Sequence, residues 1–139
     1  MQGAKAGKQV AIIDDYPRVG GNCTHFGTIP SKALRQAILR LTQFRKDPLL
    51  RAAVRDAHIS YPDLLKTAQR VINNQVTLRT GFYDRNFVDI IQGRAAFIDA
   101  NTVEVTDPAG FRETHRAQSF VIATGCRPYN PPDVDFSHP

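Results

Sequence analysis

The sequence predicts one α/β unit of the doubly wound type, in which parallel strands alternate with helices, with an antiparallel β excursion inserted into it. Two continuous apolar, β-branched runs, Gln9–Asp14 (QVAIID) and Ser119–Thr124 (SFVIAT), are typical of strands buried on both faces. Two long helical segments lie between them. We therefore expect both runs to join one sheet, with the intervening strands as the antiparallel excursion.

The N-terminal half alternates between helical segments and breaks. Met1–Ala6 is too short for a full helix and is predicted as the last turns of one, and a polar loop over Asp15–Thr28 follows the first strand. The next helix is predicted over Ser31–Arg45, where apolar residues recur at helical spacing, and Pro48 marks its latest possible end.

A second helix has clear start signals. Ser60 is a typical N-cap, and Asp63 follows three residues later in the position of a capping box. This helix should continue to about Gly81. Beyond it, short β-type runs alternate with turns at Ala100-Asn101 and Asp107–Gly110, which predicts strands over Phe87–Gln92, Arg94–Asp99, Thr102–Thr106 and Arg112–Arg116.

Composition restricts the class of protein. The chain has 139 residues, 42% of them hydrophobic, with no apolar stretch long enough to span a membrane and no apolar core of a signal peptide after MQGAKAGKQ. The formal charge of +5 comes from dispersed arginines and is not accompanied by a nucleic-acid-binding motif. Cys23 and Cys126 are far apart, so we expect no metal site, no disulfide framework and a cytoplasmic location.

Asp14 and the loop after it are the first candidates for binding. In doubly wound folds an acidic residue at the end of such a strand binds an adenosine ribose hydroxyl, although the residue alone favours an ordinary surface loop aspartate, because Asp is common after a strand. The glycine-rich fingerprint that should precede this acid by about 20 residues is absent from the sequence. Gly20 and Gly21 permit close approach to a flavin or pyrophosphate, and a helix N-terminus follows.

The segment from Gly20 to Lys32, GGNCTHFGTIPSK, resembles the redox-active loop GGxCxxxGCxPxK of dihydrolipoamide dehydrogenase and glutathione reductase, which are class I pyridine nucleotide-disulfide oxidoreductases. Cys23 matches the first redox cysteine, and Thr28 stands at the position of the second. A single cysteine in the loop cannot form the disulfide that passes electrons to a thiol substrate. The threonine form, together with RPYNPPDVDFSHP near the end, resembles the soluble, Si-specific pyridine nucleotide transhydrogenase branch of the family.

This resemblance implies FAD as cofactor, with hydride passing between NADPH and NAD⁺ through the flavin and no thiol relay. It places Asp14 at the adenosine ribose, the two glycines near the phosphates or ribityl chain, and Thr28 and Lys32 beside the flavin ring. Cys23 and His25 then have no catalytic role, and Cys126 is structural. The residues implied to bind the cofactor are Asp14, Asp15, Tyr16, Pro17, Arg18, Val19, Gly20, Gly21, Asn22, Cys23, Thr28, Lys32, Ala123, Thr124 and Gly125.

The resemblance also predicts the domain organisation. Residues 1–139 would form part of an FAD-binding domain without its first β-GxGxxG-α unit, and without the NAD(P)-binding and dimerisation domains of a homo-oligomeric parent. We expect such a chain to be inactive in transhydrogenation by itself. The alternatives are a disulfide reductase related to dihydrolipoamide dehydrogenase, which Thr28 disfavours, and a non-catalytic module for FAD binding or assembly.

Overall fold

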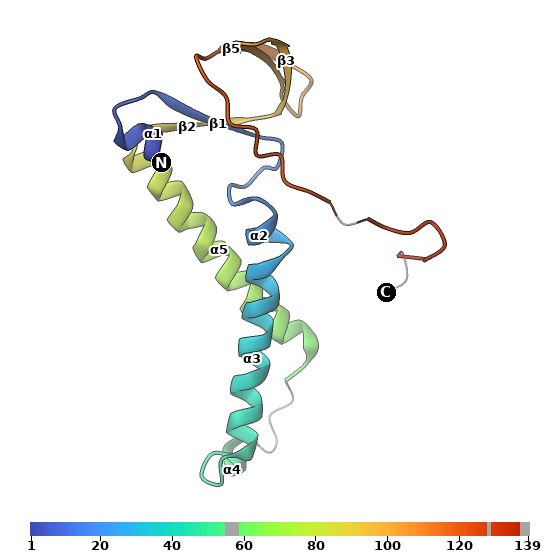
Figure 1. Ribbon diagram of the computed structural model, residues 1–139. Coiled ribbons are helices and arrows are strands. Elements are labelled where there is room, and N and C mark those ends of the chain that lie inside the picture. Colours follow the sequence, from blue (N-terminus) through green and yellow to red (C-terminus); the bar gives the residue numbers. More distant parts are fainter. Residues whose placement is uncertain (55–58, 128, 137–139) are drawn as a thin grey trace.

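The computed structural model describes residues 1–54, 59–127 and 129–136, which form a parallel pair of strands, a helical hairpin and a three-stranded antiparallel sheet (Figure 1). This arrangement confirms the predicted α/β class. The elements in chain order are α1 Gln2–Lys5, β1 Val10–Asp14, α2 Gly21–His25, α3 Thr28–Lys46, α4 Arg51–Val54, α5 Tyr61–Arg85, β2 Val88–Gln92, β3 Arg94–Asp99, β4 Thr102–Thr106 and β5 Arg112–Arg116.

The strands β1 and β2 pair in parallel, with Val10 opposite Val88 and Asp14 opposite Gln92. Our assignment of Phe87–Gln92 to the antiparallel excursion was therefore wrong. A parallel partner needs a crossover connection, and the segment from α2 to α5 supplies one. The expectation of burial on both faces was also wrong for β1, because no residue of this strand is buried. In a sheet of two strands each strand has an open edge.

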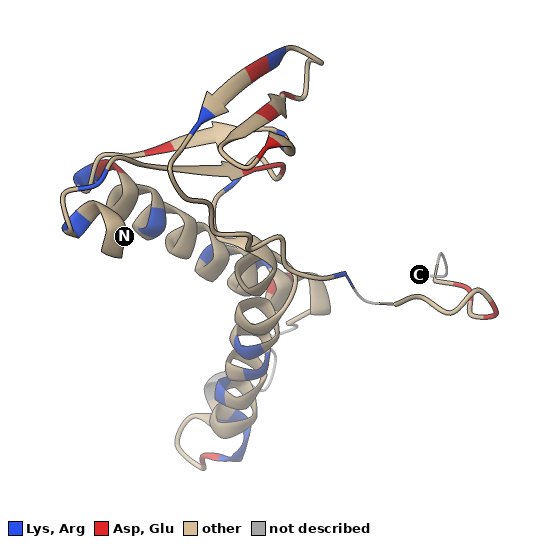
Figure 2. Ribbon diagram, turned by 45° about the horizontal axis from the view of Figure 1, so that its top comes forward, with Lys and Arg blue, Asp and Glu red and all other residues tan. Residues whose placement is uncertain are grey.

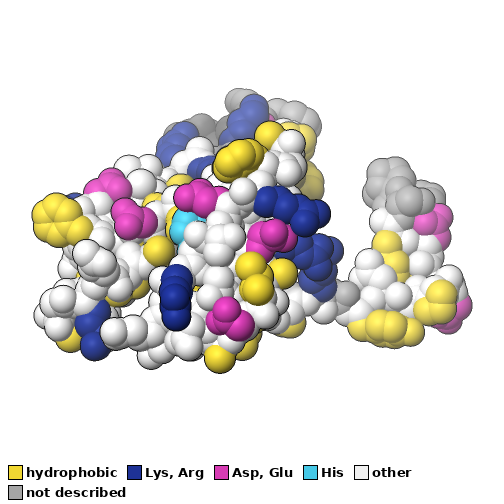
Figure 3. Space-filling view, turned by 90° about the horizontal axis from the view of Figure 1, so that it is seen from above, with side chains coloured by type: hydrophobic (Ala, Val, Ile, Leu, Met, Phe, Trp, Pro, Cys, Tyr) yellow, Lys and Arg dark blue, Asp and Glu magenta, His cyan; other side chains and the backbone are white. Residues whose placement is uncertain are grey.

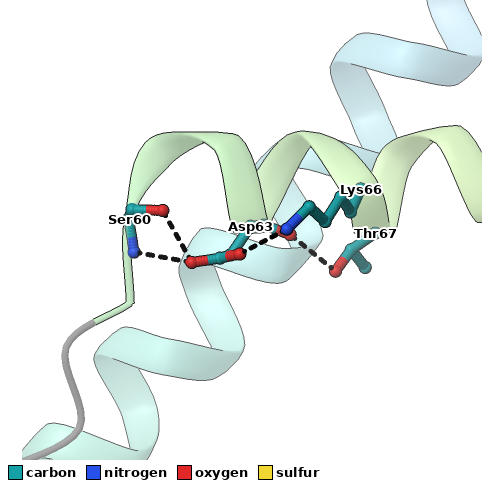
Figure 4. A network of polar contacts seen from close by, with 4 residues as sticks. All are labelled: Ser60, Asp63, Lys66 and Thr67. Carbon is teal, nitrogen blue, oxygen red and sulfur yellow. Dashed lines mark hydrogen bonds and ion pairs between the residues drawn. The ribbon is translucent and has the colours of Figure 1, made fainter.

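The helices α3 and α5 pack side by side and form the long axis of the molecule (Figure 1). The capping box predicted at the start of α5 is present: the Ser60 amide and hydroxyl both donate to Asp63 Oδ2, at 3.2 and 2.6 Å, while Lys66 Nζ lies 3.0 Å from Oδ1 (Figure 4). These contacts lower the pKa of Asp63 to about 2, the Ser60 hydroxyl contributing most. The N-terminal turn of α5 is thus fixed by its own side chains.

Helix boundaries differ from the predictions in physically clear ways. Helix α3 begins three residues before the predicted Ser31, because proline is tolerated in the first turn of a helix and Pro30 occupies that turn. Helix α5 continues past Gly81 to Arg85. Asn86 then closes it by donating from Nδ2 to the Phe82 carbonyl at 2.8 Å. The short helices α2 and α4 were not predicted at all.

The second sheet has the order β3-β4-β5 and is antiparallel throughout, as expected for the excursion. Its central strand β4 alternates in burial, so that Val103 and Val105, 2% and 3% exposed, point to one face. The other buried apolar residues are Val19, Ala68, Ile72 and Val88, which come from the loop after β1, from α5 and from β2. The described core therefore has two small centres, one under α5 and one in the second sheet.

The predicted strand Ser119–Thr124 is absent from the described structure. Val121 and Ile122 are 94% and 73% exposed, and the segment pairs with neither edge of the parallel sheet. A strand exists only as part of a hydrogen-bonded ladder, so β-branched residues without a partner strand remain extended but unpaired. From here the chain runs past α2 and extends away from the helices, and its described residues, 119–127 and 129–136, belong to no helix or strand (Figure 1).

Charged side chains are distributed over helices and strands instead of forming one basic block (Figure 2). The face seen from above carries acidic, basic and hydrophobic groups side by side (Figure 3). None of the helices described is long and apolar enough to cross a membrane.

Candidate functional site

Asp14 ends β1 at the edge where the carboxyl ends of the two parallel strands meet. Its Oδ1 accepts a hydrogen bond from the Tyr16 amide at 3.0 Å, and its carbonyl accepts one from the Gly93 amide at 2.9 Å. The carboxylate is half-buried and retains further lone pairs for a hydroxyl donor. In doubly wound folds ligands bind just outside this edge.

An open depression of about 460 Å³ lies at the same edge. It is lined by Asp15 from the loop after β1, by residues 93–96 after β2, and by residues 106–108 at the end of β4. Sequence reasoning missed the residues after β2 and β4. The available signal was Gly93, which directly follows the strand run ending at Gln92, but that run had been assigned to the other sheet.

Gly93 allows the two sheets to meet at this point. Its φ is +156°, and a Cβ there would lie 2.6 Å from Cγ1 of Val105 and 2.7 Å from the carbonyl oxygen of Thr106. No other residue would fit without displacing backbone. The close approach of the two sheets beside the depression therefore depends on a glycine at position 93.

The loop from Asp15 to Gly20 is held against α2 by His25. The Nε2 atom of His25 lies 3.1 Å from the carbonyl oxygens of both Arg18 and Val19, so this nitrogen carries the proton and donates. The ring also stacks obliquely on Tyr16, with centroids 4.6 Å apart. His25 is thus a packed, hydrogen-bonding residue that fixes the loop.

The loop is also tied to the helical hairpin. Arg18 Nη2 donates to Asn73 Oδ1 on α5 at 2.8 Å, and Val19 is buried. Asp15 and Pro17, in contrast, are exposed. The backbone of the loop is therefore held in place on one side, while the side chains of Asp15 and Pro17 remain accessible on the other.

Gly20 and Gly21 form the turn into α2, and both have φ values in the left-handed region, +130° and +63°. Thr24 is fully buried beneath this turn, and its hydroxyl donates to the Gly20 carbonyl at 2.8 Å. A Cβ on Gly20 would lie 2.7 Å from Thr24 Oγ1, whereas a Cβ on Gly21 would meet nothing within 4 Å. The backbone at Gly21 is therefore open to a ligand.

The remaining predicted residues lie on α2, at the start of α3 and in the unpaired segment after β5. Cys23 is exposed on α2, and Thr28 and Lys32 are exposed in the first turns of α3. Ala123, Thr124 and Gly125 are exposed too. The Asn22 side chain reaches this last segment, with Nδ2 3.5 Å from the carbonyl oxygen of Cys126.

The described structure thus brings together two groups of predicted residues. The strand end, the loop and the glycine turn are joined through Asp14, His25 and Thr24, and the segment 123–126 meets α2 through Asn22. Pro128 and residues 137–139 of the C-terminal motif lie outside the described residues. Among those described, no group of three or more His, Cys, Asp or Glu side chains could hold a metal ion.

Comparisons with known proteins show which proteins this chain resembles. The family described as pyridine nucleotide-disulphide oxidoreductase matches residues 1–137. Soluble pyridine nucleotide transhydrogenases from Pseudomonas putida (strain GB-1) and Azotobacter vinelandii (strain DJ) are 52% identical over all 139 residues. The chain spans only 30% of the length of these curated relatives.

Solved structures show the same fold. The LpdA protein of Mycobacterium tuberculosis is 26% identical, with a TM-score of 0.77 over 93% of this chain and 29% of that protein. The HOCl-induced flavoprotein disulfide reductase RclA of Escherichia coli, in a Cu(II) complex, is 26% identical, with a TM-score of 0.69 over 93% of this chain and 26% of that protein.

Proposed function

Because this chain belongs to the pyridine nucleotide-disulphide oxidoreductase family, whose match covers nearly all of it, we propose that it forms the FAD-contacting part of a transhydrogenase exchanging hydride between NADPH and NAD⁺. The observation that carries the proposal is the depression at the carboxyl ends of β1 and β2, beside Asp14. The residues present fit the adenosine end of FAD: a half-buried carboxylate for the ribose, and a depression beside it that is lined in part by Gly93 and Asp15.

The roles of the individual residues follow from their positions. Asp14 would accept a hydrogen bond from a ribose hydroxyl, and the open backbone at Gly21 would approach the phosphates or the ribityl chain. Lys32 would place a positive charge near the flavin ring, and a cation there stabilises negative charge on a reduced ring. Bound FAD would supply the acceptance and release of hydride, while these residues bind and orient it.

Thr28 distinguishes the proposal from the disulfide-reductase alternative. It heads α3 where the second redox cysteine of the disulfide reductases stands, so α2 and α3 present one thiol, Cys23, and no internal disulfide. The 52% identity to soluble transhydrogenases supports the same choice. In the complete protein we also propose a homo-oligomer and a cytoplasmic location, which gel filtration and cell fractionation would test.

Titration of the purified chain with FAD tests the binding proposal directly. We expect flavin fluorescence to report saturable binding, and Asp14→Ala to weaken it by roughly 10-fold or more, since a hydrogen bond to a charged group contributes about 1.5–3 kcal/mol. The matched control is Asp47→Ala, which removes a carboxylate at the C-terminal end of α3. Unchanged affinity in Asp14→Ala, or equal losses in both variants, would contradict the proposed site.

The reaction itself is tested by assaying hydride transfer from NADPH to NAD⁺ and oxidation of dihydrolipoamide side by side. Transhydrogenation without dithiol oxidation by the complete protein would support the proposal. Dithiol oxidation at dehydrogenase-like rates would favour the disulfide reductase. FAD binding by this chain with neither activity in the complete protein would identify a non-catalytic module.

A further inference from the structure

The loop from Asp15 to Val19 is clamped from outside on two sides, by α2 and by α5. On the side of α2, Nε2 of His25 donates to the carbonyl oxygens of Arg18 and Val19, each at 3.1 Å. On the side of α5, Oδ1 of Asn73, 55 positions from Arg18 along the chain, accepts a hydrogen bond from Arg18 Nη2 at 2.8 Å. One contact therefore holds the backbone of Arg18, and the other holds its side chain.

The amide of Asn73 is oriented by its own helix. Gln69, one turn earlier on α5, donates from Nε2 to the same Asn73 Oδ1 at 3.0 Å. This bond assigns the oxygen of the amide to the side that receives Arg18, because a carbonyl oxygen can accept two hydrogen bonds. The guanidinium of Arg18 therefore points to α5, where it anchors the loop.

The clamp extends to Asp14 through Tyr16. The His25 ring stacks obliquely on the Tyr16 ring, with centroids 4.6 Å apart, and the Phe26 ring meets Tyr16 edge-on at 5.3 Å. The Tyr16 amide in turn donates to Oδ1 of Asp14 at 3.0 Å. The position of Tyr16 thus sets the orientation of the Asp14 carboxylate, and His25 acts on that carboxylate through one intervening residue.

We propose that His25 and Asn73 are positioning residues for FAD, which hold the loop and the Asp14 carboxylate in the binding conformation before the cofactor arrives. The inference rests on the proposed function, in which Asp14 binds the adenosine ribose. A loop that becomes ordered only on binding weakens affinity through lost conformational entropy, and a loop that is ordered beforehand avoids this cost. Neither residue has to touch the cofactor to have this effect.

Asn73 can be replaced without disturbing the core, because it is exposed on α5. In FAD titrations followed by flavin fluorescence, Asn73→Ala should weaken binding roughly 2- to 10-fold, the equivalent of one hydrogen bond. Asn73→Asp keeps an acceptor oxygen for Arg18 and should bind FAD like the wild type. Asn74→Ala, at the next exposed position of the same helix, is the matched control and should also leave the affinity unchanged. Wild-type affinity in Asn73→Ala, or equal losses in Asn73→Ala and Asn73→Asp, would overturn the proposal.

For His25 the comparison is between His25→Gln, which keeps a donor near the place of Nε2, and His25→Leu, which has none. We expect His25→Leu to weaken FAD binding by roughly 10-fold and His25→Gln to restore part of the loss. A double-mutant cycle with Asp14→Ala separates positioning from stability: His25→Leu should cost little further affinity once Asp14 is replaced. Additive losses would mean that His25 does not act through Asp14, which contradicts the proposal. Urea unfolding of each variant shows that the titrated chains are folded.

Trypsin provides a measure of loop order that needs no cofactor. The bond between Arg18 and Val19 is a trypsin site within the loop, and Val19 is buried. In the free chain, Asn73→Ala and His25→Leu should accelerate cleavage there relative to cleavage after Arg45 on α3, because the loop opens more often. Unchanged cleavage in variants that bind FAD weakly would indicate direct contact with the cofactor and overturn the positioning role. If the wild-type chain binds no FAD, the proposed function fails together with this inference; if it binds FAD and all variants bind equally well, the inference alone fails.

Discussion

Replacing Gly20 with alanine should destabilise the chain far more than the same change at Gly21, although the two glycines are neighbours in one turn. At Gly20 the new Cβ would lie 2.7, 2.8 and 2.9 Å from Oγ1, Cβ and Cγ2 of Thr24, which is fully buried and cannot move aside freely. The backbone there has φ +130° and ψ −18°, which an L-residue rarely adopts.

The expected losses of stability follow from the overlap with Thr24 and from the strained backbone. Backbone strain of this kind costs about 1–3 kcal/mol, and overpacking of a filled site costs a further 1–3 kcal/mol, giving roughly 2–6 kcal/mol for Gly20→Ala. Gly21→Ala adds no contact within 4 Å and has a φ of +63°, inside the small left-handed region, so it should cost about 1–2 kcal/mol. A small domain is stable by only about 5–15 kcal/mol, so the difference is readily measured.

Urea unfolding followed by far-UV circular dichroism gives the free energy of unfolding for both variants. The double variant Gly20→Ala with Thr24→Gly removes the three clashing atoms and isolates the backbone term in a double-mutant cycle. Equal losses for Gly20→Ala and Gly21→Ala, or no coupling between Gly20 and Thr24, would refute the packing argument. Flavin titration of Gly21→Ala adds a second measurement: a loss of affinity larger than its loss of stability would indicate that the cofactor approaches this backbone.

Three further changes test other parts of the structure. Thr24→Val removes the hydroxyl that donates to Gly20 and should lower the free energy of unfolding by about 0.5–1.5 kcal/mol, the net contribution of a typical hydrogen bond; a neutral effect in urea unfolding would exclude a stabilising bond. The pKa of Asp63 is depressed from 3.8 to about 2, so its contribution to stability should be complete above pH 4 and be lost as the pH falls through 2; NMR titration should show this, with a higher pKa in Ser60→Ala. Gly93→Ala should destabilise the chain and abolish FAD binding, and a folded variant with normal flavin affinity would contradict the role of the depression.

The sequence correctly predicted features that are stabilised by contacts between residues close together in the chain. The start of α5 was correct because Ser60 and Asp63 satisfy each other within one turn. The end of α5 was not, because a glycine inside a helix costs only about 1 kcal/mol relative to alanine, which by itself does not end a long helix that packs against α3 and β2. The five-residue helix α2 is too short to show a helical period.

The candidate site was predictable as far as it lies on one continuous segment. Asp14 and the glycine turn follow one another in the chain, so a strand ending in an acid and a small-residue loop identified them. The lining from Gly93 to Ala96 begins directly after β2, and its place beside the end of β1 follows only once the parallel pairing of β1 with β2 is known. Two parallel strands joined by so long a crossover can be recognised from sequence only by their continuous apolar, buried residues. In β2 only Val88 is buried, so this signal was too weak to predict the pairing.

The segment Ser119–Thr124 was predicted as a strand from its residues alone, and this prediction was wrong. Its residues have the composition of a central strand, yet Val121 is 94% exposed and the segment is unpaired. Strand propensity measures how well a side chain fits a pleated, half-buried surface, so it has an effect only where a neighbouring strand supplies that surface. The sequence pattern therefore shows that this segment is able to form a strand. Whether it does so depends on a neighbouring strand with an unpaired edge. In the described structure the segment is held at its start, where the Phe120 ring stacks edge-to-face on Phe97 of β3 with centroids 5.0 Å apart, and just after its end, where Asn22 contacts Cys126.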